Sequence, residues 1–486
     1  MRTLFVLLFT IFTLPLTFAK QILIIHTNDL HSYFDGYYNG QGGYARVLTK
    51  IKELRANAEA KGIEVLQLDA GDWGDGTSFY LSDNGADSIR ALEMLGTEVA
   101  AIGNHDHMIG GKVLGDQIRR ADVNTQFVAA NLQPTPEMEL DEVISPYVDL
   151  EKGGIKTRVI GLTTSSNLYE YSMRPGRISD PVFAGDRESR RASREGKQLV
   201  IALTHLGLHE DRLLAQQSSS IDVIIGGHSH SKVTRVVWET NEYGNRVPIV
   251  QAWSHGLGVG ALLLDVSKGG HVRVINYKLH EIRSSLKKDP EMANFVEEAS
   301  EKRNLQFETD WNEVIGETKT SISGSLGGEN NWRSTCWGKH MARATREAVG
   351  ADVGIYIPGF AGVYRPAGPI RFGDIVDNFP HIRQYGDQGW EIVTVDMPGW
   401  KVRPLMYLIS RIGYGAVFSG LGYKSVDEVQ TNAIYTVALP GEIAEAIKGS
   451  LPAFSHFLRG LQYTDKYYWP VITQYVIENS PIQCPL

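Results

Sequence analysis

The chain has 486 residues, a formal net charge of −8, 42% hydrophobic residues and 21% charged residues. This composition is typical of a globular protein, and the length predicts two or three domains. A mildly acidic chain is a poor partner for polymeric nucleic acid, because phosphate neutralisation needs a basic face. The densest basic run, Arg187–Arg194, is typical of a solvated helix face. We therefore expect no nucleic-acid polymer among the partners.

The N-terminus has the pattern of a secretory signal over residues 1–19. Arg2 supplies the positive start, Leu4–Phe18 is apolar, and the small residues Thr17 and Ala19 precede Lys20. The alternative is a membrane anchor, but the apolar run is shorter than the ~20 residues that a span needs. We expect an exported protein, periplasmic or secreted, with no membrane span after the signal is removed.

Short apolar runs, each ending abruptly in polar residues, follow along the first half of the chain. They are too short for helices and rich in β-branched residues, so they predict buried strands. The runs are Ile22–Ile25, Val65–Leu68, Val99–Ile102, Leu199–Leu203, Val223–Ile225 and Val247–Val250. Helical patterns lie between them, as at Val47, Ile51 and Leu54, which indicates a layered α/β fold. In such folds ligands gather beyond the carboxyl ends of the strands.

The composition changes at Lys287–Phe307, a segment that is charged, poor in glycine and helical in pattern. We expect a domain over residues 20–285, a linker helix over 286–310 and a C-terminal domain over 311–486. The last contains predicted strands at Val353–Ile357 and Glu391–Val395 and a helix at Gly338–Val349. Its two cysteines, Cys336 and Cys484, form either a disulfide or two buried thiols.

The polar residues at the predicted strand ends have the chemistry of metal ligands. Carboxylates, imidazoles and an amide oxygen suit Zn, Mn, Co or Fe, and the set contains no thiolate. Residues two apart on an extended strand point the same way, so D-x-H and H-x-H act as pairs. The set is large enough for two divalent ions, with Asp72 as the candidate bridge. Its members are Asp29, His31, Asp72, Asn104, His105, His205, His228 and His230.

These blocks resemble the calcineurin-like metallophosphoesterases. The matching motifs are D-x-H at Asp29–His31, GD at Gly71–Asp72, GNHD at Gly103–Asp106, a lone His205 and GHxH at Gly227–His230. Three features make the chain similar to the secreted and periplasmic 5'-nucleotidase group: the sequence HTNDLH, the export signal and the extra C-terminal domain. That group includes cyclic phosphodiesterases, UDP-sugar hydrolases and thiosulfohydrolase relatives. The resemblance implies a four-layer β-sandwich flanked by helices, a linker helix and a smaller α/β substrate domain.

The resemblance also implies roles for individual residues. One ion would be held by Asp29, His31, Asp72 and His230, and the other by Asp72, Asn104, His205 and His228. A metal-bound water would attack phosphorus in line, and His105 would act as general acid or stabilise charge.

Two departures from the family pattern bear on catalysis and on substrate. A carboxylate commonly follows the catalytic His by three residues, but here that residue is Met108, so we expect Asp106 to orient His105. In the C-terminal domain, Ile357 and Gly362 stand where the family's nucleotide-gripping segment has Asn and Arg. Candidate replacements are Arg365 and Arg371. Phe360, Tyr364, Tyr356 and Trp390 are candidate base-stacking rings, with core packing as the alternative for each.

The leading expectation is an exported 5'-nucleotidase-type phosphohydrolase that acts on a small-molecule phosphoester, a nucleotide. One alternative keeps the metal centre and changes the substrate to a 2',3'-cyclic phosphodiester, a UDP-sugar or another small ester. Another is a catalytically weak binding protein, against which the full ligand set and His105 argue. The sequence predicts neither the metal identity nor the oligomeric state.

Overall fold

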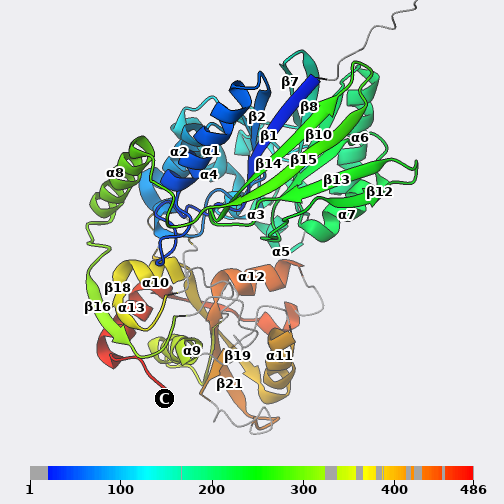
Figure 1. Cartoon of the computed structure of the whole chain (residues 1–486). Helices are drawn as coiled ribbons and strands as arrows, with labels where there is room; N and C mark the ends of the chain where they lie inside the picture. The colour runs from blue at the N-terminus through cyan, green and yellow to red at the C-terminus, as the bar shows by residue number, and fades with distance from the viewer. Residues whose placement is uncertain are drawn as a thin grey trace, which may run out of the picture.

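The computed structural model describes residues 20–165, 167–322, 336–356, 365–378, 382, 386, 388–411, 417–420, 429–450 and 455–484. The predicted signal at residues 1–19 lies outside this range. Figure 1 shows two parts, an N-terminal layered part above and a smaller C-terminal part below, connected along one side through α8. Among the described residues, no helix is both long enough and apolar enough to cross a membrane.

Two sheets form the centre of the N-terminal part. The first has the order β15 (Val272–Glu281), β14 (Gly258–Val266), β1 (Lys20–Thr27), β2 (Glu64–Asp69), β3 (Val99–Ala101), β4 (Gln126–Val128) and β6 (Ile144–Ser145). The second has the order β12 (Val237–Thr240), β13 (Arg246–Gln251), β11 (Val223–Gly226), β10 (Leu199–His205), β8 (Ile155–Thr163) and β7 (Tyr147–Lys152). The six apolar runs predicted as strands are confirmed.

The period of two along each strand explains how the sheets pack. Ile22 and Ile24 of β1 face the second sheet in a core shared with Ile201 of β10, whereas Ile25 faces the helices. The helices on the first sheet are α1 (Tyr44–Glu59), α2 (Ala86–Leu95) and α4 (Gly111–Ala121); those on the second are α6 (Pro181–Arg194) and α7 (Leu208–Gln217). The order helix, sheet, sheet, helix is the four-layer fold that the resemblance implied (Figure 1).

Helix α8 (Pro290–Phe307) leads to the C-terminal part. It lies within the linker helix expected over 286–310 and begins at Pro290, because the Asp289 side chain accepts the Met292 N–H and Pro290 occupies the first turn. After it, a sheet has the order β20 (Val417–Ser419), β17 (Val353–Tyr356), β21 (Ile434–Pro440), β19 (Glu391–Pro398) and β22 (Gln462–Tyr467). Around it lie α9 (Cys336–Ala348), α10 (Phe372–Asn378), α11 (Gly399–Arg411), α12 (Gly441–Ser450) and α13 (Tyr468–Asn479), with the pair β16 (Val314–Thr318) and β18 (Gly368–Arg371).

Cys336 and Cys484 form a disulfide, with their Cα atoms 5.8 Å apart. The bond joins the start of α9 to the C-terminal tail. It is reinforced by His340 of α9, whose Nε2 lies 3.0 Å from the Gln483 carbonyl oxygen. The alternative of two buried thiols is therefore wrong.

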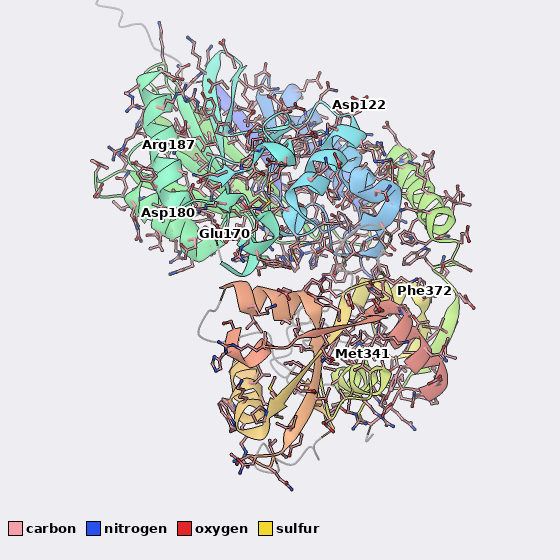
Figure 2. The ribbon with its side chains drawn as sticks, turned by 180° about the vertical axis from the view of Figure 1, so that it is seen from behind. Asp122, Glu170, Asp180, Arg187, Met341 and Phe372 are labelled. Atoms are coloured by element: carbon pink, nitrogen blue, oxygen red, sulfur yellow. A yellow bond between two sulfur atoms is a disulfide. The ribbon has the colours of Figure 1, made fainter. Side chains whose placement is uncertain are left out.

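The two parts contact each other on both sides of the strand ends. On one side the Ser78 N–H of η1 (Ser78–Gly85) donates to Asp377 of α10 at 2.7 Å. On the other, Arg174 Nη2 donates to the Gly449 carbonyl at 3.1 Å. Figure 2 shows Glu170, the last residue of α5 (Asn167–Glu170), at the edge of the N-terminal part that faces α12, and Arg187 away from it on α6.

Candidate metal centre

The predicted ligands come together at the carboxyl ends of the parallel strands. Asp29 and His31 follow β1, Asp72 follows β2, and Asn104 begins α3 (Asn104–His107) just after β3. From the second sheet, His205 ends β10, and His228 and His230 follow β11. Because β1, β2 and β3 are parallel, as are β10 and β11, both sheets deliver their ends to one edge (Figure 1). That edge faces the C-terminal part.

The chain takes an unusual backbone conformation at most of these residues. Positive φ angles occur at Asp29 (51°), His31 (48°), Asp72 (55°), His228 (74°) and His230 (51°). Each such conformation costs a non-glycine residue about 1–3 kcal/mol and persists only where the surroundings impose it. Here the β1 and β2 loops impose it on each other, since the Asp29 N–H donates to the Gly71 carbonyl and the His31 N–H to the Asp72 carbonyl, both at 2.9 Å. The strain turns the side chains toward one point.

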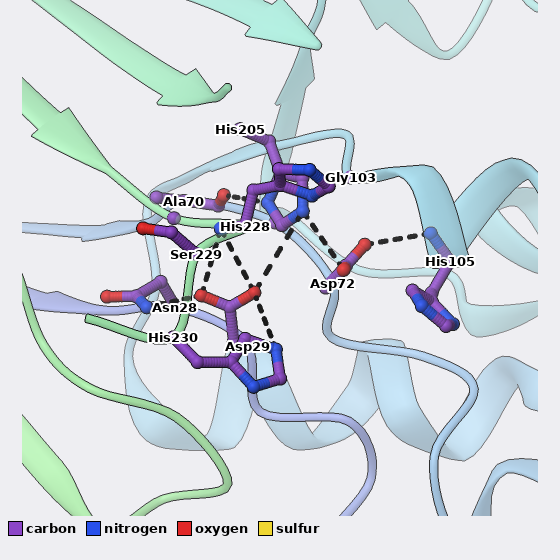
Figure 3. A network of polar contacts seen from close by, with 12 residues as sticks. Asn28, Asp29, Ala70, Asp72, Gly103, His105, His205, His228, Ser229 and His230 are labelled. Carbon is purple, nitrogen blue, oxygen red and sulfur yellow. Dashed lines mark hydrogen bonds and ion pairs between the residues drawn. The ribbon is translucent and has the colours of Figure 1, made fainter. Parts of the chain in front are cut away.

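Asp29 lies at the bottom of the cluster and is fully buried. The Asn28 amide donates to its Oδ2 at 2.5 Å, and the His228 N–H donates to both of its carboxylate oxygens at 3.0–3.1 Å. His230 Nε2 lies 3.3 Å from Asp29 Oδ1 (Figure 3). The carboxylate is therefore held by the same loop that supplies two imidazoles.

Asp72 belongs to both halves of the cluster. Its Oδ2 lies 2.9 Å from His205 Nε2 and 3.7 Å from His31 Nε2. Ligand atoms within 4.8 Å of one another form the groups Asp29, His31, Asp72 and Asp72, His205, His228. Figure 3 shows Asp72 between the His205 side and His105. A carboxylate common to two groups is what a bridge between two ions requires.

The outer nitrogens of two imidazoles are already occupied. His31 Nδ1 lies 2.8 Å from the Asp75 carbonyl oxygen, and His205 Nδ1 lies 2.7 Å from the Ala70 carbonyl oxygen. A carbonyl only accepts, so Nδ1 carries a proton in each ring and Nε2 is the nitrogen that faces the cluster. This is the arrangement of metal-ligating histidines, whose second nitrogen donates to a carbonyl or carboxylate. Although burial opposes it, Asp72 raises the pKa of His205 to about 10, so this ring would release its Nε2 proton on binding an ion.

Two further observations fit a metal. Asn104 Oδ1 is buried without a hydrogen-bond partner among the described residues, and a buried amide oxygen normally has one. His31 and His228 are kept neutral, because burial lowers the pKa of each to about 4. Against the effect of burial, His205 and His105 hold the pKa of Asp72 well below its usual range. Neutral imidazoles and an ionised carboxylate are the ligating forms.

His105 stands beside the cluster and is oriented by Asp75. Its Nδ1 lies 2.8 Å from Asp75 Oδ2, and its backbone N–H donates to Asp72 Oδ1 at 2.8 Å. Although burial opposes it, Asp72 and then Asp75 raise the pKa of His105 to about 9. The ring meets His31 edge to face, with centroids 4.9 Å apart, so it is adjacent to the ligands without being among their groups.

The expectation that Asp106 orients His105 is wrong. The Asp106 carboxylate is fully buried and accepts the backbone N–H groups of Asp72 (2.9 Å), Gly74 (2.9 Å) and Gly103 (2.8 Å). It holds the β2 and β3 loops together, and the orienting carboxylate comes instead from the β2 loop. Sequence inspection missed Asp75, although it is the last acid of the stretch DAGDWGDG.

Met108 has a packing role. Its partly buried side chain contacts the apolar core of the C-terminal part. A thioether in place of a carboxylate thus adds an apolar contact between the two parts beside the candidate site.

The predicted ligands come together in one cluster, whereas the predicted substrate-binding residues that the structure describes lie at separate places in the C-terminal part. Arg365 is engaged by its own domain, with Nε donating to Asp374 Oδ1 at 2.7 Å and Nη2 to Asp377 Oδ2 at 3.2 Å. Arg371 is exposed on β18. Phe360 and Tyr364 lie outside the described residues. Of the other candidate rings, Tyr356 and Trp390 are 1% and 2% exposed in the C-terminal core, so they serve packing and not base stacking.

One residue near the cluster was missed altogether. His255, from the stretch QAWSHG after β13, lies beside His31 and His230. The signal was present in the sequence, since β13 ends in polar residues as the other strands do.

The chain matches the family model "Calcineurin-like phosphoesterase" over residues 22–232. It is 28% identical over 332 residues to a snake venom 5'-nucleotidase of Gloydius brevicauda and 30% identical over 331 residues to a 5'-nucleotidase of Diplobatis ommata. Each alignment covers 63% of this chain and 55% of the relative, so the chain spans about half the length of the curated relatives it matches.

Solved structures share the two-part fold. A 5'-nucleotidase precursor of Thermus thermophilus has a TM-score of 0.81 at 22% identity, covering 94% of this chain and 96% of that chain. The sulfate thiohydrolase SoxB of Thermus thermophilus has a TM-score of 0.72 at 15% identity, covering 94% of each chain. These structures show the fold alone, whereas the family match places a calcineurin-like phosphoesterase domain at residues 22–232, the range that contains all the strand-end motifs.

Proposed function

We propose that the chain is a phosphohydrolase that binds two divalent ions and cleaves phosphate esters of nucleotides. The observation that carries the proposal is the pair of ligand groups that share Asp72. The first ion would be held by Asp29, His31, Asp72 and His230, and the second by Asp72, Asn104, His205 and His228. When bound, such ions activate water and neutralise the phosphoryl oxygens.

His105 would act on the ester itself. Hydrolysis breaks the bond between phosphorus and the ester oxygen, and that oxygen leaves with a proton. The His105 imidazolium stands beside the ligands with its Nδ1 paired with Asp75 at 2.8 Å, and we assign to its Nε2 the protonation of the leaving oxygen. Asp75 keeps the ring in that orientation and favours its protonated form.

A nucleotide substrate is supported by the names of the relatives and by a C-terminal part that faces the cluster. A second candidate retains the centre and replaces the nucleotide by another small phosphoester, such as a 2',3'-cyclic phosphodiester or a UDP-sugar. The burial of Tyr356 and Trp390 favours this second candidate, because those two rings are not accessible for stacking on a nucleotide base.

We also infer that the protein is exported. The pattern of residues 1–19 supports this, and so does the disulfide between Cys336 and Cys484, since disulfides persist in oxidising compartments.

The test is a hydrolysis panel with protein from Lys20 onward, loaded with Mn or Zn. It compares AMP, 2',3'-cyclic AMP, a UDP-sugar and an aryl phosphate, with Asp72→Ala as the blank and Asp116→Ala, an exposed acid of α4, as the matched control. We expect preference for AMP, abolished only in the blank. Activity on another ester and none on AMP would show that the substrate is that ester and not a nucleotide. Equal activity in the blank would refute the shared-carboxylate centre.

A further inference from the structure

We propose that His255 is an additional ligand of the ion held by Asp29, His31 and His230, and that Tyr37 positions its ring. This inference rests on the proposed two-ion centre. It adds a third imidazole to one of the two sites and thereby makes the sites chemically different.

The positions of the three rings suit one ion. Ligand nitrogens of His31, His230 and His255 all lie within 4.8 Å of one another, and His31 Nε2 is 3.1 Å from His230 Nε2. Nitrogens bound about 2.0–2.1 Å from one ion lie about 2.8–3.4 Å apart at right or tetrahedral angles. The His255 ring meets both others edge to face, with centroids 5.4 Å from His31 and 5.0 Å from His230. His31 and His230 therefore already have the spacing of two ligands of one ion, and a His255 nitrogen lies within 4.8 Å of both.

The His255 ring is held in a defined orientation. It stacks flat on Tyr33, with centroids 4.1 Å apart and 12° between the planes, and its Nδ1 lies 2.5 Å from the Tyr37 hydroxyl. With the proton on Nδ1 donated to the Tyr37 oxygen, the Nε2 lone pair is available to the ion. This repeats the pattern of His31 and His205, whose Nδ1 atoms are likewise occupied.

The backbone around His255 is strained and fastened to the first ligand loop. Trp253 and His255 have φ angles of 73° and 55°. Asn28 holds the segment at both of its amide atoms, donating to the Trp253 carbonyl at 2.6 Å and accepting the Ala252 N–H at 2.7 Å. The His255 N–H donates to the Asp29 carbonyl at 2.6 Å. Strain of this kind is retained where geometry serves a function.

The burial of His255 agrees with this role. Its side chain is buried, with 2% of the residue exposed, and its ring faces the imidazoles of His31 and His230. A cation placed among three converging imidazoles would bind in His255 a ring that is shielded from solvent.

The ligand sets of the two ions then differ in kind. The first would combine three imidazoles, from His31, His230 and His255, with the carboxylates of Asp29 and Asp72. The second would combine two imidazoles with the Asp72 carboxylate and the Asn104 amide oxygen. Imidazole suits Zn, Fe, Cu and Ni, and oxygen ligands suit Mn and Mg. We therefore expect the first site to retain Zn when the second has lost it.

The test uses Lys20-onward protein and Zn alone. Metal content is measured by mass spectrometry during titration with a chelator, for wild type, His255→Phe, Tyr37→Phe and the exposed control His271→Phe. Phe preserves the stack on Tyr33 and removes the ligand. We expect wild type and the control to hold two ions, His255→Phe to bind one of them at least tenfold more weakly, and Tyr37→Phe to show a smaller loss. Replacement of Zn by Co should give an absorption spectrum that changes in His255→Phe.

A folded His255→Phe variant that holds both ions with wild-type affinity and an unchanged Co spectrum would overturn the inference and leave the two-ion centre intact. Wild type that never holds two ions would overturn both. If His255→Phe does not fold, anomalous diffraction from Zn-loaded wild-type crystals decides. A Zn–Nε2 distance of about 2.0–2.1 Å to His255 supports the inference, and an ion not bonded to His255 overturns it.

Discussion

Replacement of Asp75 by Asn should slow catalysis without removing metal. The Asp75 carboxylate lies 2.8 Å from His105 Nδ1 and is 4% exposed, so the contact is charge-assisted and shielded from water. Such a hydrogen bond contributes about 1.5–3 kcal/mol. If that energy holds His105 in its catalytic orientation and charge state, kcat falls about 10- to 100-fold, since about 1.36 kcal/mol is tenfold in rate. His31 keeps its partner, because it uses the Asp75 backbone carbonyl.

The assay compares kcat and KM for AMP and for p-nitrophenyl phosphate, with metal content measured in parallel. An alkoxide needs a proton to leave and a nitrophenolate does not, so the loss should be large with AMP and small with the aryl ester. Asp116→Asn serves as the matched control, because it replaces an exposed acid on α4. Equal losses on both substrates, or a leaving-group effect confined to Asp106→Asn, would refute the reasoning.

Two further predictions concern stability. Replacing Cys336 and Cys484 together by Ser removes a link between residues 148 apart in sequence. Chain entropy alone predicts that the free energy of unfolding falls by at most about 5 kcal/mol. An unchanged urea midpoint for the C-terminal part would contradict this. Burial raises the pKa of Asp222 to about 7, although its Oδ2 accepts the Val200 N–H at 2.8 Å. A raised folded-state pKa means that stability present below about pH 4 is lost as pH rises toward 7. Asp222→Asn should therefore gain up to about 4 kcal/mol over wild type at about pH 8 and little at about pH 4 in urea unfolding, whereas a gain independent of pH would contradict the assignment.

The position of the candidate ligands followed from the sequence because sheet geometry is restrictive. Parallel strands place their carboxyl ends at one edge, so polar residues after β1, β2 and β3 meet wherever those strands pair. Asp29, Asp72 and Asn104 needed no further information to be grouped. The same rule applies to His205 and His228 in the second sheet.

Contacts between loops did not follow from the sequence. Asp75 and Asp106 are both acids near the site, and spacing in the chain alone favoured Asp106. The turn at α3 directs the Asp106 carboxylate to three backbone N–H groups, which leaves His105 to Asp75. His255 was overlooked for a related reason. The polar end of β13 indicated a segment at the ligand edge, but the strained turn that directs the His255 ring toward His31 has no clear sequence signal, because positive φ at a non-glycine residue is rare.

Six strands of the N-terminal part, the edge where the ligands meet and a helix at α8 were predicted from the amino-acid order, because hydrophobic period and strand-end chemistry are local properties. Three features required the folded chain: which carboxylate orients His105, the bond between Cys336 and Cys484, and the burial of Tyr356 and Trp390 in a core. Each of these depends on distances between segments far apart in the chain, and these distances are set by packing of the whole molecule.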